Sequence, residues 1–238
     1  MRIVFMGTPD FAVPSLKILV ENNFEVVGVI SSPDKKAGRG RKIHKSAVKK
    51  YAESVGMNIL QPKNLKAQEF IDELYELNAD LQIVVAFRML PKVVWSMPKL
   101  GTINLHASLL PDYRGAAPIN WAIINGEKKT GVTTFFLKHE IDTGNILFQE
   151  DVEIRNEDNA GSLHDKLMIE GAKLVLRSAI AVQNGDYEAQ EQDQTLAKNK
   201  APKIFHEDCR INFKQEAQNV INFIRGLSPY PGAWCLLN

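Results

Sequence analysis

Short apolar runs alternate with amphipathic segments through the first half of the chain. Each apolar run is bounded by polar or turn-forming residues and predicts a strand. The predicted strands cover residues 2–7, 25–32, 58–62, 81–87 and 101–110. Apolar residues at helical spacing predict helices over residues 14–23, 45–56 and 67–78.

Two longer apolar segments follow and predict a pair of adjacent strands. They cover residues 131–142 and 144–154 and meet around residues 142–145, as a hairpin or a nearby loop. In the part of the chain before them, strands alternate with helices. This order is typical of an α/β fold with a doubly wound, mainly parallel sheet and helices on both faces, a Rossmann-like arrangement.

A long helix is predicted over residues 162–186. Ser162 and Asp165 have the spacing of a capping box at its start, and Gly185 suits its C-terminal end. A final helix is predicted over residues 213–226, before a segment with two prolines and a glycine.

These boundaries predict two parts of unequal size. We expect a main domain over residues 1–205. Residues 206–238 would then form the terminal helix and the start of a linker, because proline-rich segments after a helix often connect domains.

Composition adds few constraints. The 238 residues are 45% hydrophobic and 24% charged, as in an ordinary globular protein. The net charge of +1 gives no long-range field that would draw the whole protein to nucleic acid or to a membrane. Cys209 and Cys235 lack metal-ligand spacing, and no apolar run approaches the length of a membrane span. We therefore expect a cytoplasmic protein without a metal or a membrane partner.

The predicted strand over residues 101–110 carries polar side chains at alternate positions. Side chains alternate between the two faces of a strand, so Asn104, His106 and Ser108 should share one face. Open α/β sheets bind their ligands beyond the carboxyl ends of their strands. The end of this strand is therefore a candidate site.

Two familiar motifs are incomplete. The turn after the first strand has one glycine, where a dinucleotide-binding loop has three, and Pro9 removes a main-chain donor; an NAD or ATP phosphate site is therefore disfavoured. Asp142 begins an Asp-Thr-Gly triplet, but an aspartic protease needs two such aspartates sharing a proton. A simpler role for Asp142 is to accept a hydrogen bond from a histidine and stabilise its charged form.

A basic segment covers residues 34–45. Its cations are Lys35, Lys36, Arg39, Arg41, Lys42 and Lys45. It is interpretable as a solvated surface loop or as a loop that contacts a phosphate backbone, where cations give affinity without reading sequence. Composition leaves both readings open.

Asn104, His106 and Asp142 together predict a reaction class. They supply an oxyanion donor, an imidazolium and a carboxylate, which suit acyl transfer to an amine that is already nucleophilic. The sequence shows no serine or cysteine nucleophile elbow and no metal-ligand cluster.

Four segments then resemble a known family. "MGTPDFAVPSL", "PDKKAGRGRK", "INLHASLLPDYRGAAPINWAIINGE" and "IDTGNIL" occur in order and closely resemble the methionyl-tRNA formyltransferases. The Asn-x-His-x-Ser-Leu-Leu-Pro strand with its downstream aspartate is similar to the wider folate-dependent formyltransferase group. The "YRGAAPI" continuation and the basic loop resemble the tRNA-specific branch.

The resemblance implies transfer of a formyl group from 10-formyltetrahydrofolate to initiator methionyl-tRNA. It implies that Asn104, His106 and Asp142 are catalytic, and that the chain acts without a metal, as a monomer. The implied folate-contacting residues are Phe87, Arg88, Met89, Leu90, Ser108, Leu109, Leu110, Pro111 and Ile141. The implied tRNA-binding residues are Lys36, Arg39, Arg41 and Lys42.

The resemblance also predicts what residues 206–238 lead to, because family members normally continue into a C-terminal β-barrel domain. Other acceptors stay open: glycinamide ribonucleotide, a sugar nucleotide, or water in a formyltetrahydrofolate hydrolase. A non-catalytic folate-binding module is the alternative from a different class, and it would bind folate without transferring formyl groups.

Overall fold

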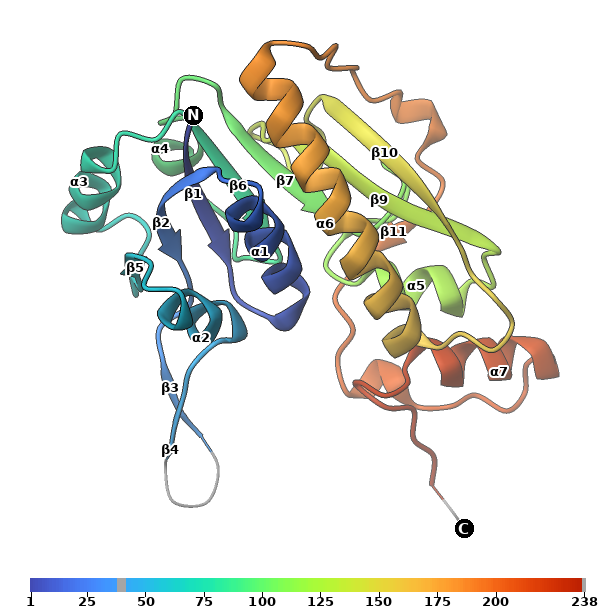
Figure 1. Cartoon of the computed structure of the whole chain (residues 1–238). Coiled ribbons are helices and arrows are strands. Elements are labelled where there is room, and N and C mark those ends of the chain that lie inside the picture. The colour runs from blue at the N-terminus through green and yellow to red at the C-terminus, as the bar shows by residue number, and fades with distance from the viewer. Residues whose placement is uncertain (38–41, 237–238) are drawn as a thin grey trace.

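A computed structural model describes residues 1–37 and 42–236. A seven-stranded sheet forms its centre, in the order β10-β9-β7-β6-β1-β2-β5 (Figure 1). Its strands are β1 (Arg2–Gly7), β2 (Glu25–Ile30), β5 (Ile59–Leu60), β6 (Leu81–Val85), β7 (Thr102–His106), β9 (Lys129–Phe136) and β10 (Ile146–Glu153). The predicted strands are therefore all present; β1 has the predicted bounds, and the other strands are shorter than their apolar runs.

The strands on one side of the sheet are parallel and those on the other are antiparallel. β5, β2, β1, β6 and β7 run parallel to one another, whereas β9 is antiparallel to both β7 and β10. The predicted doubly wound, mainly parallel sheet is confirmed, and so is the pairing of the two strands after residue 128. The chain reverses its winding direction between β1 and β6, which is where folds of this type place a ligand crevice.

Helices cover both faces of this sheet (Figure 1). They are α1 (Val13–Glu21), α2 (Ala47–Ser54), α3 (Gln68–Glu76), α4 (Lys92–Trp95), α5 (Pro118–Ile124), α6 (Ala160–Asn184) and α7 (Ala217–Gly226). The short helices α4 and α5 were not predicted, because one or two turns give too little periodicity to recognise. No helix among the described residues is long and apolar enough to cross a lipid bilayer.

Strand alternation divides the interior into two apolar clusters. Ile3 and Phe5 of β1 face the larger cluster, which contains residues of α1 and α6, whereas Val4 and Met6 face the smaller one beside α3 and α4. On β7, Ile103 and Leu105 belong to the larger cluster. Residues 104 and 106 therefore face the opposite side of the sheet.

Two details of the predicted elements are wrong. β7 ends at His106, so Ser108 lies beyond the strand; its fully buried hydroxyl donates to the carbonyl of Asp112 at 2.7 Å. The long helix begins at Ala160, and its capping box joins Asn159 to Ser162 in place of Ser162 and Asp165. Asn159 provides the extended backbone and the side-chain acceptor that a helix start needs. Gly185 caps the helix as predicted.

Short strands lie outside the main sheet. β3 (Lys35–Ala37) and β4 (Lys42–His44) form an antiparallel hairpin that extends from the sheet in Figure 1. β8 (Arg114–Gly115) pairs with β11 (Lys200–Ala201), which ties the region after β7 to the segment after α6. α7 packs against α5 near the C-terminal end of the described chain.

Candidate active site

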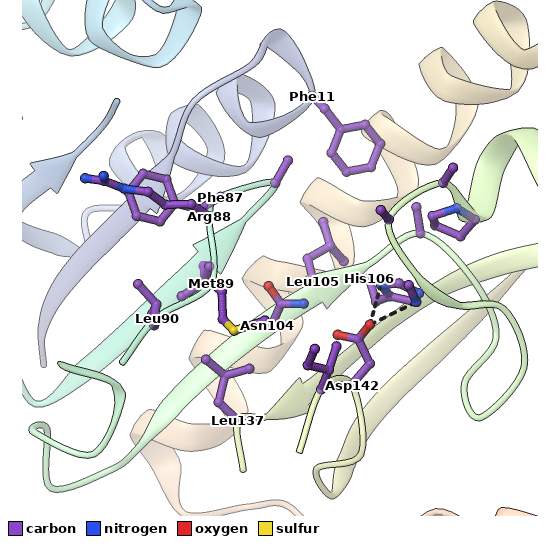
Figure 2. A pocket seen from close by; sticks show the side chains of 18 of the residues that line it. Phe11, Phe87, Arg88, Met89, Leu90, Asn104, Leu105, His106, Leu137 and Asp142 are labelled. Carbon is purple, nitrogen blue, oxygen red and sulfur yellow. Dashed lines mark hydrogen bonds and ion pairs between the residues drawn. The ribbon is translucent and has the colours of Figure 1, made fainter. Parts of the chain in front are cut away.

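A cavity of about 730 Å³ opens at the carboxyl ends of β1, β6 and β7 (Figure 2). Its volume lies within the range of small-molecule sites. Its lining includes the chain after β1, the chain after β6, the end of β7 and the loop between β9 and β10. The lining residues are Pro9, Phe11, Val84, Ala86, Phe87, Arg88, Met89, Leu90, Trp95, Asn104, Leu105, His106, Ala107, Gly115, Ala116, Ala117, Pro118, Ile119, Asn120, Leu137, Lys138, His139, Glu140, Ile141, Asp142 and His164.

The three residues expected to be catalytic all line this cavity. Asn104 and His106 come from alternate positions of β7, on the face opposite the larger apolar cluster. Asp142 comes from the loop between β9 and β10, and Figure 2 shows its carboxylate directed at His106. The fold therefore brings an amide, an imidazole and a carboxylate into one small space.

His106 is held by main-chain geometry. Its Nε2 lies 2.9 Å from the carbonyl oxygen of Tyr113, which can only accept, so Nε2 carries a proton and donates it. The second ring nitrogen, Nδ1, faces Asp142. Because Nε2 is already protonated, Nδ1 can donate to a ligand only when the ring is an imidazolium.

Asp142 lies close to His106 without bonding to it directly. Its Oδ2 is 3.9 Å from Nδ1 of His106, within electrostatic reach but beyond hydrogen-bond distance. The same oxygen accepts a 3.2 Å hydrogen bond from the main-chain N–H of Gly115. The side chains of His106 and Asp142 are only 8% and 14% exposed, so their interaction is weakly screened by solvent.

Left-handed backbone conformations occur at the border of the site. Five non-glycine residues among those described have positive φ, and two of them are asparagines, which tolerate it. The other three are Ala86, Tyr113 and Asp142, with φ values of 46°, 57° and 55°. Ala86 and Asp142 line the cavity, and the carbonyl of Tyr113 accepts the hydrogen bond from His106. Backbone strain at functional residues persists only where the surroundings enforce it.

The wall formed by the chain after β6 is largely apolar. Phe87, Met89 and Leu90 belong to this wall, and Ile141 lines the cavity from the loop between β9 and β10. Apolar surface of this kind suits a flat ring system such as a pterin. Arg88 also lines the cavity, but its guanidinium donates to the carbonyls of Pro62 and Lys63. Burial lowers the pKa of this guanidinium. Figure 2 shows the Arg88 guanidinium directed away from Asn104 and His106.

The segment over residues 108–111 does not line the cavity. Its main chain is tied to β9 and β10: Thr133 donates to the carbonyl of Ser108 at 2.7 Å and accepts from the N–H of Leu110 at 3.1 Å. Gln149 donates to the carbonyl of Leu110 at 2.9 Å. The contacts place Ser108, Leu109, Leu110 and Pro111 behind the site, where they support the turn after His106.

Two of the four expected tRNA-binding residues are described, and both lie in the β3–β4 hairpin. Lys36 and Lys42 are in its two strands, and Arg39 and Arg41 fall outside the described residues. Among residues 1–37 and 42–236, no cluster of three or more histidine, cysteine or acidic side chains suits a metal ion.

Sequence reasoning missed several residues at the opposite end of the cavity. Phe11 and His164 meet there edge to face, with ring centroids 5.2 Å apart, and both line the cavity. Pro118, Ile119 and Asn120 also line the cavity. The resemblance covered the last three by sequence without assigning them a role. No periodic signal marked His164, which lies in the first turns of α6.

Comparisons with known proteins identify the family of this chain. A family model described as formyl transferase matches residues 1–179, and one described as formyl transferase, C-terminal domain, matches residues 203–238. Methionyl-tRNA formyltransferases of Bacteroides fragilis and Bacteroides thetaiotaomicron are 58% and 59% identical over 237 residues. These alignments cover 98% of this chain and 73% and 74% of those proteins.

A solved structure has the same architecture. The N-formyltransferase from Helicobacter canadensis, in complex with folinic acid and dTDP-3-aminofucose, superposes with a TM-score of 0.73 and 26% sequence identity. The match covers 94% of this chain and 79% of that one. Both the fold and the resemblance inferred from sequence are confirmed, and the chain belongs to the formyltransferase family, among the methionyl-tRNA formyltransferases.

Proposed function

We propose that this chain transfers the formyl group of 10-formyltetrahydrofolate to the α-amino group of initiator methionyl-tRNA. The identity of 58% to a methionyl-tRNA formyltransferase over nearly the whole chain carries this proposal. The cavity supports it, because it joins an apolar wall to three polar groups suited to acyl transfer. That the chain acts as a monomer stays a prediction.

The chemistry requires little activation of the nucleophile. An α-amine has a pKa of about 7.7–8.0, so a useful fraction is neutral near pH 7 and can attack a formyl carbon. The new C–N bond forms as the carbonyl oxygen becomes an oxyanion. The bond from the formyl carbon to N10 then breaks, and a proton passes from the attacking amine to the leaving nitrogen. The costly species is the oxyanion.

Asn104 and His106 stabilise this oxyanion in our proposal. The Asn104 amide can donate from β7, and the imidazolium form of His106 can donate from Nδ1. The backbone of Asn104 is held in β7 and the ring of His106 is held by the Tyr113 carbonyl, so both donors need little reorganisation when charge develops. Removal of one such donor typically costs about 3–4 kcal/mol.

Asp142 has two functions in our proposal. It stabilises the positive charge on the His106 ring, from which it is separated by 3.9 Å in a mostly buried setting. It also accepts the proton that leaves the amine. One carboxylate oxygen accepts from Gly115, and the other side of the carboxylate borders the cavity where the amine would react.

The two ends of the cavity divide the substrates. Phe87, Met89, Leu90 and Ile141 suit the pterin of the folate, whereas the end with Phe11 and Pro118 would accept the aminoacyl group. Arg88 would contribute its main chain and stem, since its guanidinium is engaged elsewhere. Direct folate contact by residues 108–111 stays a prediction.

Recognition of tRNA would use the β3–β4 hairpin. Lys36 and Lys42 lie in its two strands, and the sequence of this nearly neutral chain adds Arg39 and Arg41 between them. Cations of this kind bind phosphates. We further propose that residues 1–205 form the catalytic domain and that residues 206–238 lead toward a C-terminal domain. The match of a C-terminal-domain family model to residues 203–238 supports this division.

A transfer assay with several acceptors tests the function. The purified protein is supplied with radiolabelled 10-formyltetrahydrofolate and, separately, initiator methionyl-tRNA, free methionine, an amino-sugar nucleotide, glycinamide ribonucleotide or water alone. Label on methionyl-tRNA, far above the other acceptors, is expected. Preferential labelling of another acceptor, release of formate in water, or folate binding with no transfer would each overturn the proposal in favour of a stated alternative.

A further inference from the structure

Gln192 lies beneath the loop that carries Asp142. It follows α6 in an otherwise exposed segment, yet it is only 4% exposed. Its Nε2 donates two hydrogen bonds into the loop, to the carbonyl of Asp142 at 2.9 Å and to the carbonyl of Gly144 at 2.8 Å. Both protons of the amide are therefore used on the main chain of one short turn.

Arg114 fixes the orientation of this amide. Its Nε donates to Oε1 of Gln192 at 3.2 Å, and its Nη2 donates to the same oxygen. Because a guanidinium can only donate, the amide oxygen must face Arg114 and the amide nitrogen must face the loop. The direction of the Gln192 side chain is therefore set by charge as well as by packing.

These contacts form a closed ring around Asp142. Arg114 precedes Gly115, whose N–H donates to the Asp142 carboxylate, and Gln192 connects Arg114 to the main chain of Asp142. Gly115 is required there, since a Cβ would lie 2.4 Å from the carbonyl oxygen of Ala201. The ring thus fixes both the carboxylate and the backbone that bears it.

The turn needs such support. Asp142 has φ of 55°, a conformation that costs a non-glycine residue free energy. At Gly144 a Cβ would lie 1.6 Å from the carbonyl oxygen of Phe136, so the loop passes close against β9. Without the two bonds from Gln192, the loop could relax to a right-handed backbone and move the carboxylate away from His106.

We propose that Gln192 is a positioning residue for formyl transfer, acting through Asp142. Its amide holds the turn over residues 142–144, in which Asp142 is left-handed, so that the Asp142 carboxylate stays beside Nδ1 of His106. This inference rests on the proposed function and adds to it a residue far from the motifs in sequence. Gln192 itself does not line the cavity.

Gln192→Ala tests this role in single-turnover reactions. We expect the transfer rate to fall on the order of 10- to 100-fold, as for a catalytic group displaced by about 1 Å, with little change in folate affinity. Gln192→Glu should be equally slow. The glutamate keeps an oxygen that accepts from Arg114, but its second oxygen cannot donate to the carbonyls of Asp142 and Gly144. This variant therefore loses the contact to the loop while it keeps the contact to Arg114.

The matched control is Gln194→Ala. Gln194 is exposed and accepts from the same guanidinium, at 2.6 Å from Nη1 of Arg114, but among the described residues it forms no hydrogen bond with the loop over residues 142–144. Its removal should leave the rate unchanged. A loss of rate in Gln194→Ala equal to that in Gln192→Ala would overturn the proposal, because the effect would then arise at Arg114.

A double-mutant cycle separates positioning from general destabilisation. In an Asp142→Ala background, Gln192→Ala should have almost no further effect on rate, although it lowers the unfolding temperature in both backgrounds. If the rate loss of the double variant equalled the product of the losses of the two single variants, the two residues would act independently and the proposal would be overturned. The unsubstituted protein is measured first with the acceptor panel, and the cycle is run with whichever acceptor is labelled. Failure of the tRNA assignment is therefore distinct from failure of the Gln192 assignment.

Discussion

Asp142 and Asp158 are both mostly buried, but their carboxylates have very different surroundings. The Asp158 side chain is 5% exposed and accepts from Lys166 Nζ at 2.6 Å, from the Arg155 N–H at 2.7 Å and from the Ser162 hydroxyl at 2.9 Å. The Asp142 side chain is 14% exposed, and within residues 1–37 and 42–236 its carboxylate accepts a hydrogen bond only from the Gly115 N–H, at 3.2 Å, with His106 at 3.9 Å. Among the described residues no lysine or arginine forms an ion pair with Asp142.

The difference in hydrogen-bond partners indicates that Asp158 is a structural carboxylate and that Asp142 is a reactive one. Burial by itself would raise the pKa of Asp158, but the hydrogen bonds from Lys166, Arg155 and Ser162 outweigh it and hold the pKa below its usual value. A carboxylate that accepts three hydrogen bonds, one of them from a lysine, is a poor proton acceptor. Asp142 keeps part of its carboxylate available at the cavity, at the cost of a left-handed backbone.

Asp142→Asn should have the largest effect on activity. The amide preserves shape but removes the negative charge beside His106 and the proton acceptor, so we expect the single-turnover rate to fall about 100-fold or more. Folate binding should stay close to that of the unsubstituted protein, because the apolar wall is untouched. Rapid-quench transfer rates and folate titration by fluorescence measure the two quantities.

The comparison of the two aspartates also predicts that Asp142→Asn has little effect on stability. Asp142 forms few bonds, so the free energy of unfolding of Asp142→Asn in urea should barely change. A variant that transferred formyl groups at nearly the normal rate, or that lost activity only by unfolding, would contradict the division between the two aspartates.

Asp158→Asn should show the opposite profile. Loss of a charged acceptor that receives three hydrogen bonds should lower the free energy of unfolding by about 2–3 kcal/mol. Transfer at 25 °C should stay normal while the protein remains folded. Urea titration and the transfer assay on the same preparation measure both properties, and a large rate loss without destabilisation would contradict this assignment.

The stability loss should depend on pH in a defined direction. The pKa of Asp158 is lower in the folded chain than in the unfolded chain, so its contribution is complete above the unfolded pKa of about 3.9. It is lost as the pH falls from there through the folded pKa. The stabilities of the unsubstituted protein and Asp158→Asn should therefore differ at pH 6 and converge in acid. A constant difference across that range would contradict the pKa argument.

Sequence patterns predicted the two regions with unequal success. The alternation of Asn104 and His106 and the turn at Asp142 were enough to predict that these side chains meet at a sheet edge, and the structure brings them together. The strand itself stops at His106, because the next residues turn to bond with β9. Apolar continuity through residue 110 could not reveal that turn.

The hydrogen bonds that hold the site residues from other parts of the chain could not be predicted from the sequence. Gln192 is a single glutamine in a polar segment, and its bonds to Asp142 and Gly144 depend on a chain path that no local period encodes. The contact between the Tyr113 carbonyl and His106 could not be predicted either, because every residue has a main-chain carbonyl and the sequence does not show which one is used. The partners of Asp158 lie within eight residues of it, but competing cap patterns in "NEDNAGSLHD" obscured the helix start.

The smallest predicted effect concerns that helix start. Asn159→Ala removes the side chain that accepts from the Ser162 N–H at 2.9 Å, which should lower the free energy of unfolding by about 1 kcal/mol. Activity should not change, because the cap is remote from Asp142 in both sequence and bonding.

Asp165→Ala is the matched control. Asp165 contacts the His164 ring and takes no part in the cap, so its removal should cost less in urea titration. A larger cost for Asp165→Ala than for Asn159→Ala would mean that the helix begins at Ser162. The network around Asp158, which also includes Ser162, would then need to be reassigned.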